Sequence, residues 1–278
     1  MVSNERFRLS KVLYLSLAHF TVDFYAGFLA PLLPILQVSL GMSITKTASL
    51  VAIFTLTASL LQALFGYLFD RWRGLNMVAL APVLVAVTVS HFGFVNSYTS
   101  LVLLMVAGGI GIAAFHPHGA ALSALESGER HGVGMSIFVT GGTVGIAVGA
   151  LVVAHLVENF ELASLRYTVV FGLLMAILFW RKVSYERLEG RESAQKSSSN
   201  PLIGYGFLVL LGLMAMLRAF MILGFQSFVP LYLANQSVGL PTIGWVLFAF
   251  NLAGGIGGLT GGSWAERIGE KGVVFASF

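Results

Sequence analysis

The strongest constraint in this sequence is a series of long apolar runs, each about as long as a helix that crosses a lipid bilayer. About 20 helical residues span the hydrocarbon, and eight such runs lie at residues 12–38, 46–69, 75–95, 99–121, 134–157, 164–180, 203–233 and 242–265. Hydrophobic residues make up 57% of the chain and charged residues 10%, against about 25% charged residues in soluble domains. The runs are continuously apolar and do not alternate, which excludes a membrane β-barrel. The sequence therefore predicts an all-α membrane protein.

The basic residues are distributed unevenly between the loops. If the N-terminus is cytoplasmic, almost all loop Lys and Arg fall on the cytoplasmic side, and only Lys46 and Arg166 fall on the other. Short cytoplasmic loops carry such an excess. The bias predicts a multi-pass membrane protein with its N-terminus in the cytoplasm, and we expect the membrane to be a bacterial or archaeal plasma membrane. It also explains the net charge of +4 without a nucleic-acid partner.

A polar stretch divides the chain into two parts. Residues 181–200 are charged and then serine-rich, without an apolar face, which indicates a flexible cytoplasmic linker. We expect an N-terminal six-helix bundle at 1–180, the linker at 181–202, and the first two helices of a second bundle at 203–278.

A short motif recurs on the two sides of this linker. Gly66–Arg71 and Gly262–Arg267 each contain a small residue, three spacers, an acid and an arginine, at an offset of 196 residues. With six spans from one copy to the next, both copies have the same orientation, so the repeat is parallel. A complete second half would give twelve helices, and the sequence therefore predicts a C-terminally truncated chain. A natural eight-helix protein is the alternative.

Several stretches form a specific combination with this loop. They are His19-Phe20-x-x-Asp23, Phe115-His116-Pro117, residues 127–132 leading into 136–145, and residues 247–255 leading into 265–269. Together with Gly66–Arg71 they resemble the major facilitator superfamily, and more narrowly its fosmidomycin-resistance branch of drug exporters. The resemblance implies a helical bundle of twelve spans that transports a small molecule and is coupled to protons.

The fifth span is similar to a glycine signature of antiporters in this superfamily. The matching residues are Gly132, Gly141, Gly145 and Gly149, whereas Ile146 stands where the signature has proline and Ala150 where it has glycine. The family also tends to carry an acid at the position of His118. The last three of these glycines form a stripe of small residues that lets helices approach closely. Static packing and a sliding seam are both consistent with it.

Asp23 is the most informative residue for function, because it lies midway along the first span. An ionised Asp at the bilayer centre costs roughly 2.5–3.5 kcal/mol, so its side chain is expected to face the bundle interior or water. Burial favours the neutral carboxyl group and a nearby cation favours the ionised one, which suits a proton carrier. A structural polar contact is the alternative. His19 lies one helical turn earlier on the same face and is a candidate proton relay.

Arg218 lies midway along the seventh span, the repeat partner of the first. Both spans line the central cavity in the superfamily fold, so we expect an Asp23–Arg218 pair for which substrate or proton competes. The alternatives are a permanent ion pair and direct binding of an anionic substrate by the guanidinium group.

His116 and His118 lie in the fourth span, and their H-x-H spacing occurs in some metal sites. Residues two apart on a helix point to different faces and no third ligand is evident, so the sequence predicts neither a metal site nor a cofactor. The resemblance implies that His116 is a cavity or gate residue.

The charged loops are candidates for a conformational switch. In the superfamily such charges pair with neighbouring helix ends, which here implies Gly66, Asp70, Arg71 and Arg73. Glu266 and Arg267 would form the second copy. A loop that only sets the topology is the alternative.

The leading functional hypothesis is proton-coupled export of a small drug-like or anionic compound by a monomer that works by alternating access. Uptake of an organic anion or sugar is the alternative. The sequence has no cysteine and no H-E-x-x-H or G-x-S-x-G pattern, which disfavours an intramembrane enzyme. It also has no phosphate-binding Gly-Lys loop, which disfavours direct driving by ATP.

Overall fold

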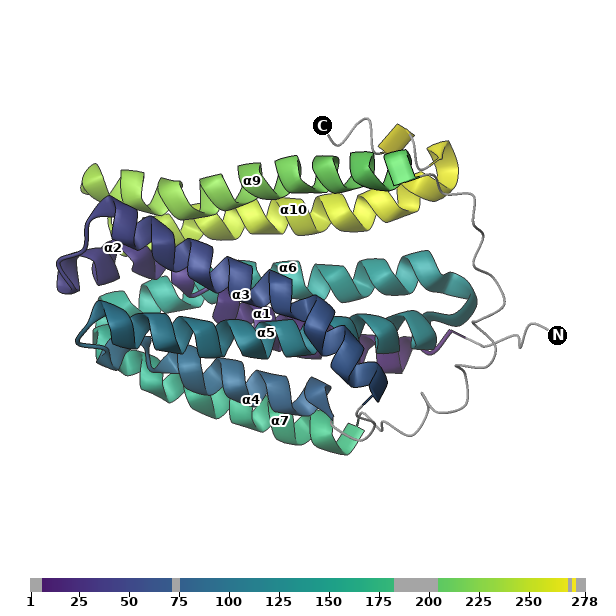
Figure 1. Ribbon diagram of the computed structural model, residues 1–278, viewed down its shortest axis with the longest axis horizontal. Helices are drawn as coiled ribbons and strands as arrows, with labels where there is room; N and C mark the ends of the chain where they lie inside the picture. The colour runs from purple at the N-terminus through teal and green to yellow at the C-terminus, as the bar shows by residue number, and fades with distance from the viewer. Residues whose placement is uncertain (1–6, 72–75, 183–204, 270–271, 274–278) are drawn as a thin grey trace.

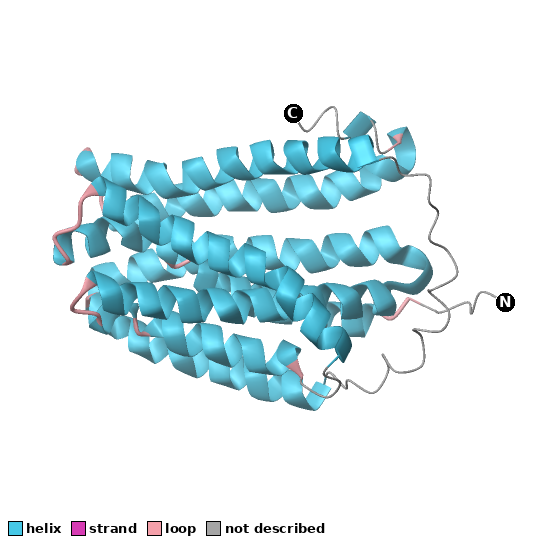
Figure 2. Ribbon diagram, in the orientation of Figure 1, coloured by secondary structure: helices cyan, strands magenta, loops and turns pink. Residues whose placement is uncertain are grey.

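The computed structural model describes residues 7–71, 76–182, 205–269 and 272–273, and within them the chain is helical with short loops (Figures 1 and 2). The α-helices are α1 (Leu9–Ala26), α2 (Leu29–Ser39), α3 (Ile44–Arg71), α4 (Met77–Ser90), α5 (Tyr98–Ser127), α6 (His131–Phe160), α7 (Val169–Lys182), α9 (Tyr205–Asn235) and α10 (Leu240–Ile268). Three 3₁₀ segments join them: η1 (Phe92–Phe94), η2 (Gly128–Arg130) and η3 (Leu162–Thr168). No strand occurs in these ranges, and the predicted all-α class is confirmed.

The predicted spans correspond to helices of the structure. Seven stretches of the described chain are long and apolar enough to cross a membrane. One of them, Tyr98–Phe160, has 63 residues, which at about 1.5 Å per residue is roughly three times the hydrocarbon thickness. This stretch contains α5 and α6, which fold back on each other at η2 (Figure 1). Counting α5 and α6 separately gives the eight predicted spans.

The first span is broken into α1 and α2 at Gly27 and Phe28. Pro31 explains the position of the break. A proline ring clashes with the carbonyl group four residues earlier, which here belongs to Gly27. The break therefore occurs one turn before Pro31.

Successive spans run in opposite directions, so their ends gather at two levels. α1, α4, α6 and α9 begin at the right-hand end in Figure 1, and α3, α5, α7 and α10 end there. Most basic residues that the structure describes at helix ends lie at this level: Arg8, Lys11, Arg71, Arg130 and Arg181. Lys46 and Arg166 lie at the other end. This segregation agrees with the expected orientation, and the side of the membrane that each end faces stays a prediction.

α1 lies at the centre of the first six spans. It packs most extensively on α6, and α4 and α5 cover its other sides. α3 packs on α5, and α7 packs on α4. In the second part of the chain α10 packs along α6, whereas α9 contacts mainly α2 and α10 (Figure 1). The predicted linker lies almost wholly outside the described residues, so the division at 181–202 stays a prediction.

Glycines bring the backbones of α1 and α6 together. Three glycines of α6 each lie against a backbone carbonyl group of α1 that an added Cβ would strike: Gly141 at Ser16, Gly145 at Phe20 and Gly149 at Phe24. The residue numbers rise by four in both helices from one contact to the next, so the two helices run parallel. The contact joins one row of residues on α1 to one row of glycines on α6. This α1–α6 seam places the polar residues of α1 directly beside α6.

Candidate functional site

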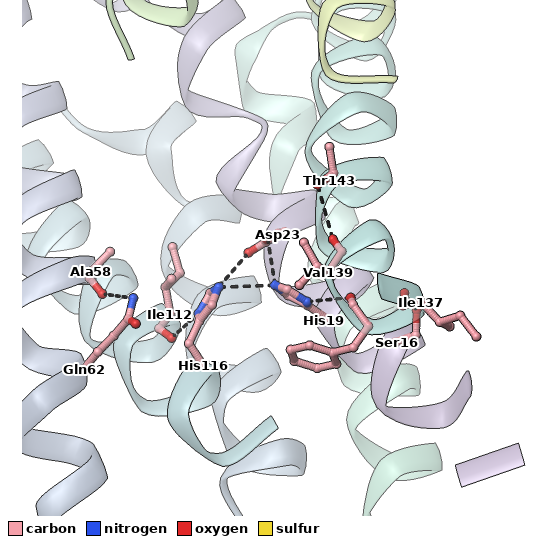
Figure 3. A network of polar contacts seen from close by, with 11 residues as sticks. Ser16, His19, Asp23, Ala58, Gln62, Ile112, His116, Ile137, Val139 and Thr143 are labelled. Atoms are coloured by element: carbon pink, nitrogen blue, oxygen red, sulfur yellow. Dashed lines mark hydrogen bonds and ion pairs between the residues drawn. The ribbon is translucent and has the colours of Figure 1, made fainter. Parts of the chain in front are cut away.

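Three polar side chains from two helices meet inside the bundle (Figure 3). His19 and Asp23 come from successive turns of α1, and His116 comes from α5. The Nε2 atom of His19 lies 3.2 Å from Oδ2 of Asp23 and 3.3 Å from Nε2 of His116. Nε2 of His116 lies 3.7 Å from Oδ1 of Asp23. His19 and Asp23 are buried and His116 is half-buried. We refer to these three residues as the polar triad.

Backbone carbonyl groups hold both imidazole rings from their far side. His19 donates its Nδ1–H to the carbonyl oxygen of Phe138, and His116 donates its Nδ1–H to that of Ile112, each over 2.8 Å. A carbonyl oxygen only accepts hydrogen bonds, so Nδ1 carries a proton in both rings. In neutral rings both Nε2 atoms are then acceptors, and they face each other and the acceptor oxygens of Asp23. Buried acceptors without a donor are costly, so the polar triad calls for a cation between its members.

The surroundings of the triad leave little freedom to its rings. The His19 ring stacks on Phe138 with 4.3 Å between centroids and lies 5.6 Å from the Phe115 ring. Gly142 of α6 forms another wall, because an added Cβ there would contact Nε2 of His19 and Oδ2 of Asp23. Only glycine at position 142 therefore lets the three groups meet as they do.

A cavity of about 250 Å³ opens beside the triad, bordered by Asp23 and His116. Its walls come from α1, α2, α3, α5, α6 and α9, so it lies between the two parts of the chain. Spans one, four and seven were expected to line it and do so, and spans two and five contribute as well. Apart from the triad residues, its described lining is apolar or carries neutral hydroxyl and amide groups. No Lys or Arg is among those residues.

The sequence analysis missed the polar residues of the cavity wall. Thr55, Ser59 and Gln62 line the cavity from α3. Their spacing places them on one face of α3, so a search for polar stripes within the spans would have found them.

A second missed group lies between α9 and α10. Gln226, which lines the cavity, donates its Nε2–H to Oδ1 of Asn251 over 2.7 Å. Asn251 in turn donates to the carbonyl oxygen of Leu247 over 2.8 Å. This pair joins the two helices next to the cavity. A single amide side chain in each of two apolar spans is the sequence feature that could have predicted the pair.

The expected pair of Asp23 and Arg218 is not formed in the structure. Arg218 is exposed on α9, and the ion pairs of Asp23 are with His19 and His116. The prediction assumed that the middle of span seven lies level with the middle of span one. α9 instead contacts mainly α2, the second half of span one.

The residues with the geometry to hold a metal ion differ from those considered in the sequence. His116 and His118 were considered together, and α5 directs only His116 toward Asp23. The described residues contain a different set with the geometry to hold a metal ion, namely His19, Asp23 and His116. The packing of α1 against α5 brings together residues that lie about a hundred positions apart in the sequence.

The residues of the expected switch loops are only partly described. Gly66 faces Pro117 at ordinary contact distance. Arg71 is exposed and donates to the hydroxyl group of Tyr67 over 2.6 Å. Arg73 and the side chains of Asp70, Glu266 and Arg267 lie outside the described residues, so a switch role for these loops stays a prediction.

Comparison with known proteins agrees with this architecture. The family model described as Major Facilitator Superfamily matches residues 15–278. The chain is 25% identical over 275 residues to the fosmidomycin resistance protein of Escherichia coli (strain K12), covering 95% of this chain and 66% of that protein. It is 22% identical over 276 residues to the uncharacterized MFS-type transporter YfnC of Bacillus subtilis (strain 168), covering 96% and 68%. The chain thus spans about two thirds of the length of both relatives.

A further similarity covers a shorter region. The chain is 26% identical over 160 residues to a protein of Escherichia coli (strain K12) named "Probable L-galactonate transporter", covering 56% of this chain and 35% of that protein.

Proposed function

Because this chain belongs to the major facilitator superfamily, whose members are transporters and not enzymes, we propose that it exports a small drug-like compound in exchange for protons by alternating access. The compound, the protons and the lipid bilayer are its partners, and the protein works as a monomer in a bacterial or archaeal plasma membrane. Its N-terminus lies in the cytoplasm, as the basic loops indicate.

The observation that carries the proposal is the convergence of acceptors in the polar triad. With Nδ1–H of both rings bound to carbonyl oxygens, the Nε2 atoms and the Asp23 carboxylate share one space and need a cation there. A proton is the cation that the membrane gradient supplies. Asp23 and His116 border the cavity, so a proton has a route from the cavity to the buried carboxylate.

Coupling follows from the position of the triad at the cavity wall. With a proton bound, the triad has no net charge and suits an apolar surrounding. Without it, the carboxylate carries an uncompensated charge, which favours an arrangement open to water. A molecule that enters the cavity on one side and a proton that enters on the other therefore stabilise opposite orientations of the helices.

The cavity lining favours a neutral compound with hydrogen-bonding groups. The side chains of Thr55, Ser59, Gln62 and Gln226 offer hydroxyl and amide groups. An anionic substrate was suggested mainly by Arg218, which is exposed on α9 and does not line the cavity.

Export is favoured by the resistance for which the Escherichia coli relative is named and by the antiporter-like glycines of α6. The proposed switch uses the α1–α6 seam together with the loop that contains Gly66, Asp70, Arg71 and Arg73. Glu266 and Arg267 form its second copy.

Uptake of an organic anion or sugar acid is a second candidate function, favoured by the similarity to the protein named as a transporter of L-galactonate. Proteoliposomes loaded with a fosmidomycin-type compound or with a sugar acid distinguish the two when the same proton gradient is imposed on both. Export coupled to protons predicts that a proton gradient drives the first compound against its own gradient and leaves the second unmoved.

The decisive test replaces Asp23 in the 278-residue chain reconstituted in vesicles. Asp23→Asn keeps the shape of the side chain and removes the group that binds the proton, so substrate-driven proton flux is expected to fall to the level of empty vesicles. Glu158→Gln, which alters an exposed acid of α6, is the matched control and should keep the wild-type flux. Coupled flux that survives Asp23→Asn would remove the triad from the mechanism.

A further inference from the structure

We propose that the polar triad is also a binding site for a divalent transition-metal ion of the zinc type, held by Nε2 of His19, Nε2 of His116 and a carboxylate oxygen of Asp23. The three ligand atoms lie within 4.8 Å of one another. The proposal goes beyond transport and does not depend on it, because it concerns binding alone.

The distances in the triad match those around a tetrahedral ion. Ligand atoms at about 2.0–2.1 Å from a tetrahedral zinc ion lie about 3.3–3.4 Å from one another. Nε2 of His19 is 3.3 Å from Nε2 of His116 and 3.2 Å from Oδ2 of Asp23. The remaining separation, 3.7 Å, joins Nε2 of His116 to the second carboxylate oxygen. The carboxyl group must therefore rotate to bring a single oxygen into the ligand set with both nitrogens.

The outer hydrogen bonds are those that metal-binding histidines need. A ligating imidazole usually donates its other N–H to a backbone carbonyl or a carboxylate, which fixes the tautomer and aims the free nitrogen at the metal. His19 and His116 do so through Phe138 and Ile112. Packing on Phe138 fixes the plane of the His19 ring as well. The site is therefore preorganised without the ion.

The donor set selects the kind of metal. Imidazole nitrogens suit zinc, copper, iron and nickel, whereas magnesium and calcium prefer oxygen ligands only. Three protein ligands leave a fourth position open, as in zinc sites that bind water or an exchangeable ligand. Asp23 and His116 border the cavity, so this fourth position is accessible to water or to an oxygen donor of a molecule in the cavity. An ion in this place also ties α1 to α5.

Equilibrium dialysis of the purified 278-residue chain against zinc chloride, after removal of bound metal with a chelator, tests the proposal. Bound zinc is measured by plasma mass spectrometry, without substrate or gradient, so the result is independent of transport. We expect one zinc ion per chain, and a visible spectrum typical of tetrahedral coordination when cobalt replaces zinc. Magnesium chloride at the same concentration should leave no bound metal.

Variants show whether the triad holds the ion. Asp23→Asn and His116→Gln each remove one ligand and should weaken zinc binding by more than about 100-fold, the upper end of the loss caused by removing an outer hydrogen-bond partner. Gly142→Ala keeps all three ligands and fills the space between them, because its Cβ would contact His19 and Asp23. It should weaken zinc binding as well.

His155→Gln is the matched control. Its ring donates Nδ1–H to the carbonyl oxygen of Leu151 over 2.9 Å, the same bond to the preceding turn that His116 makes, but it is not part of the triad. This variant should bind zinc like the wild type. Zinc binding that is equally strong in His116→Gln and Asp23→Asn, in samples that elute as folded protein from a sizing column, would overturn the proposal. An equal loss in His155→Gln would do the same.

Discussion

The first span and α9 occupy corresponding places in the sequence repeat, and each carries one charged residue midway. The two charged residues differ in their burial. Asp23 is buried and has partners on two helices, whereas Arg218 is exposed. The most apolar stretch of α9 has the higher mean hydropathy, 1.9 against 1.4 for the first span, but none of it is buried inside the protein, against 72% for the first span. Hydropathy measures how well a helix tolerates lipid, and burial depends on which neighbours surround it.

The glycines show the same contrast. Those of α6 touch the backbone of α1, whereas Gly258 of α10 has no atom within 4 Å of an added Cβ. Small residues at intervals of four therefore mark a close contact only where another helix lies against them. Three predictions test this difference between packed sites on α1 and α6 and exposed sites on α9 and α10.

The largest effect is expected at the α1–α6 seam. Gly149→Ala places a Cβ against the carbonyl group of Phe24, and overpacking of this kind costs about 1–3 kcal/mol. Gly258→Ala meets no neighbouring atom and should stabilise α10 by up to about 1 kcal/mol, because alanine favours the helix more than glycine does. Thermal unfolding in detergent measures both, at roughly 2–4 °C per kcal/mol. Equal shifts for the two variants would break the contrast between the seam and α10.

A smaller effect is expected at Tyr25, which links α1 to α7. Its hydroxyl group donates to the carbonyl oxygen of Thr168 over 2.6 Å and accepts from the backbone N–H of Gly172 over 2.9 Å. Tyr25→Phe keeps the packing of the ring and removes these hydrogen bonds, whose typical net contribution to stability is about 0.5–1.5 kcal/mol.

The matched control for Tyr25 is Tyr232→Phe on α9, where the ring is exposed. This variant should unfold at the wild-type temperature. A wild-type midpoint for Tyr25→Phe would mean that the link between α1 and α7 contributes nothing to stability.

The smallest effect is expected at Arg218. Because its side chain is exposed and Asp23 pairs with the two histidines, Arg218→Gln should shift the stability by less than about 0.5 kcal/mol. It should also keep substrate-driven proton flux in vesicles, in contrast to Asp23→Asn. A loss of flux in Arg218→Gln as complete as in Asp23→Asn would restore the pairing that the repeat suggested.

Most of the fold could be predicted from the sequence because membrane spans are set by local composition. Each apolar run becomes a helix, since the backbone must satisfy its own hydrogen bonds in lipid. Pro31 even sets the break between α1 and α2 through a clash one turn away. The site was predictable only in part. Asp23, His19 and His116 stood out because polar groups are rare in apolar spans, but their meeting depends on the way that α1, α5 and α6 pack.

The sequence alone determined which eight apolar runs form spans, and that a carboxyl group lies in the middle of the first run. These properties depend on residues that are neighbours along the chain. Only the tertiary structure decided that Asp23 meets two histidines and not Arg218, and that Gly142 leaves room for them. Such contacts join α1, α5 and α6, and they depend on which helix faces approach one another, which no local pattern specifies.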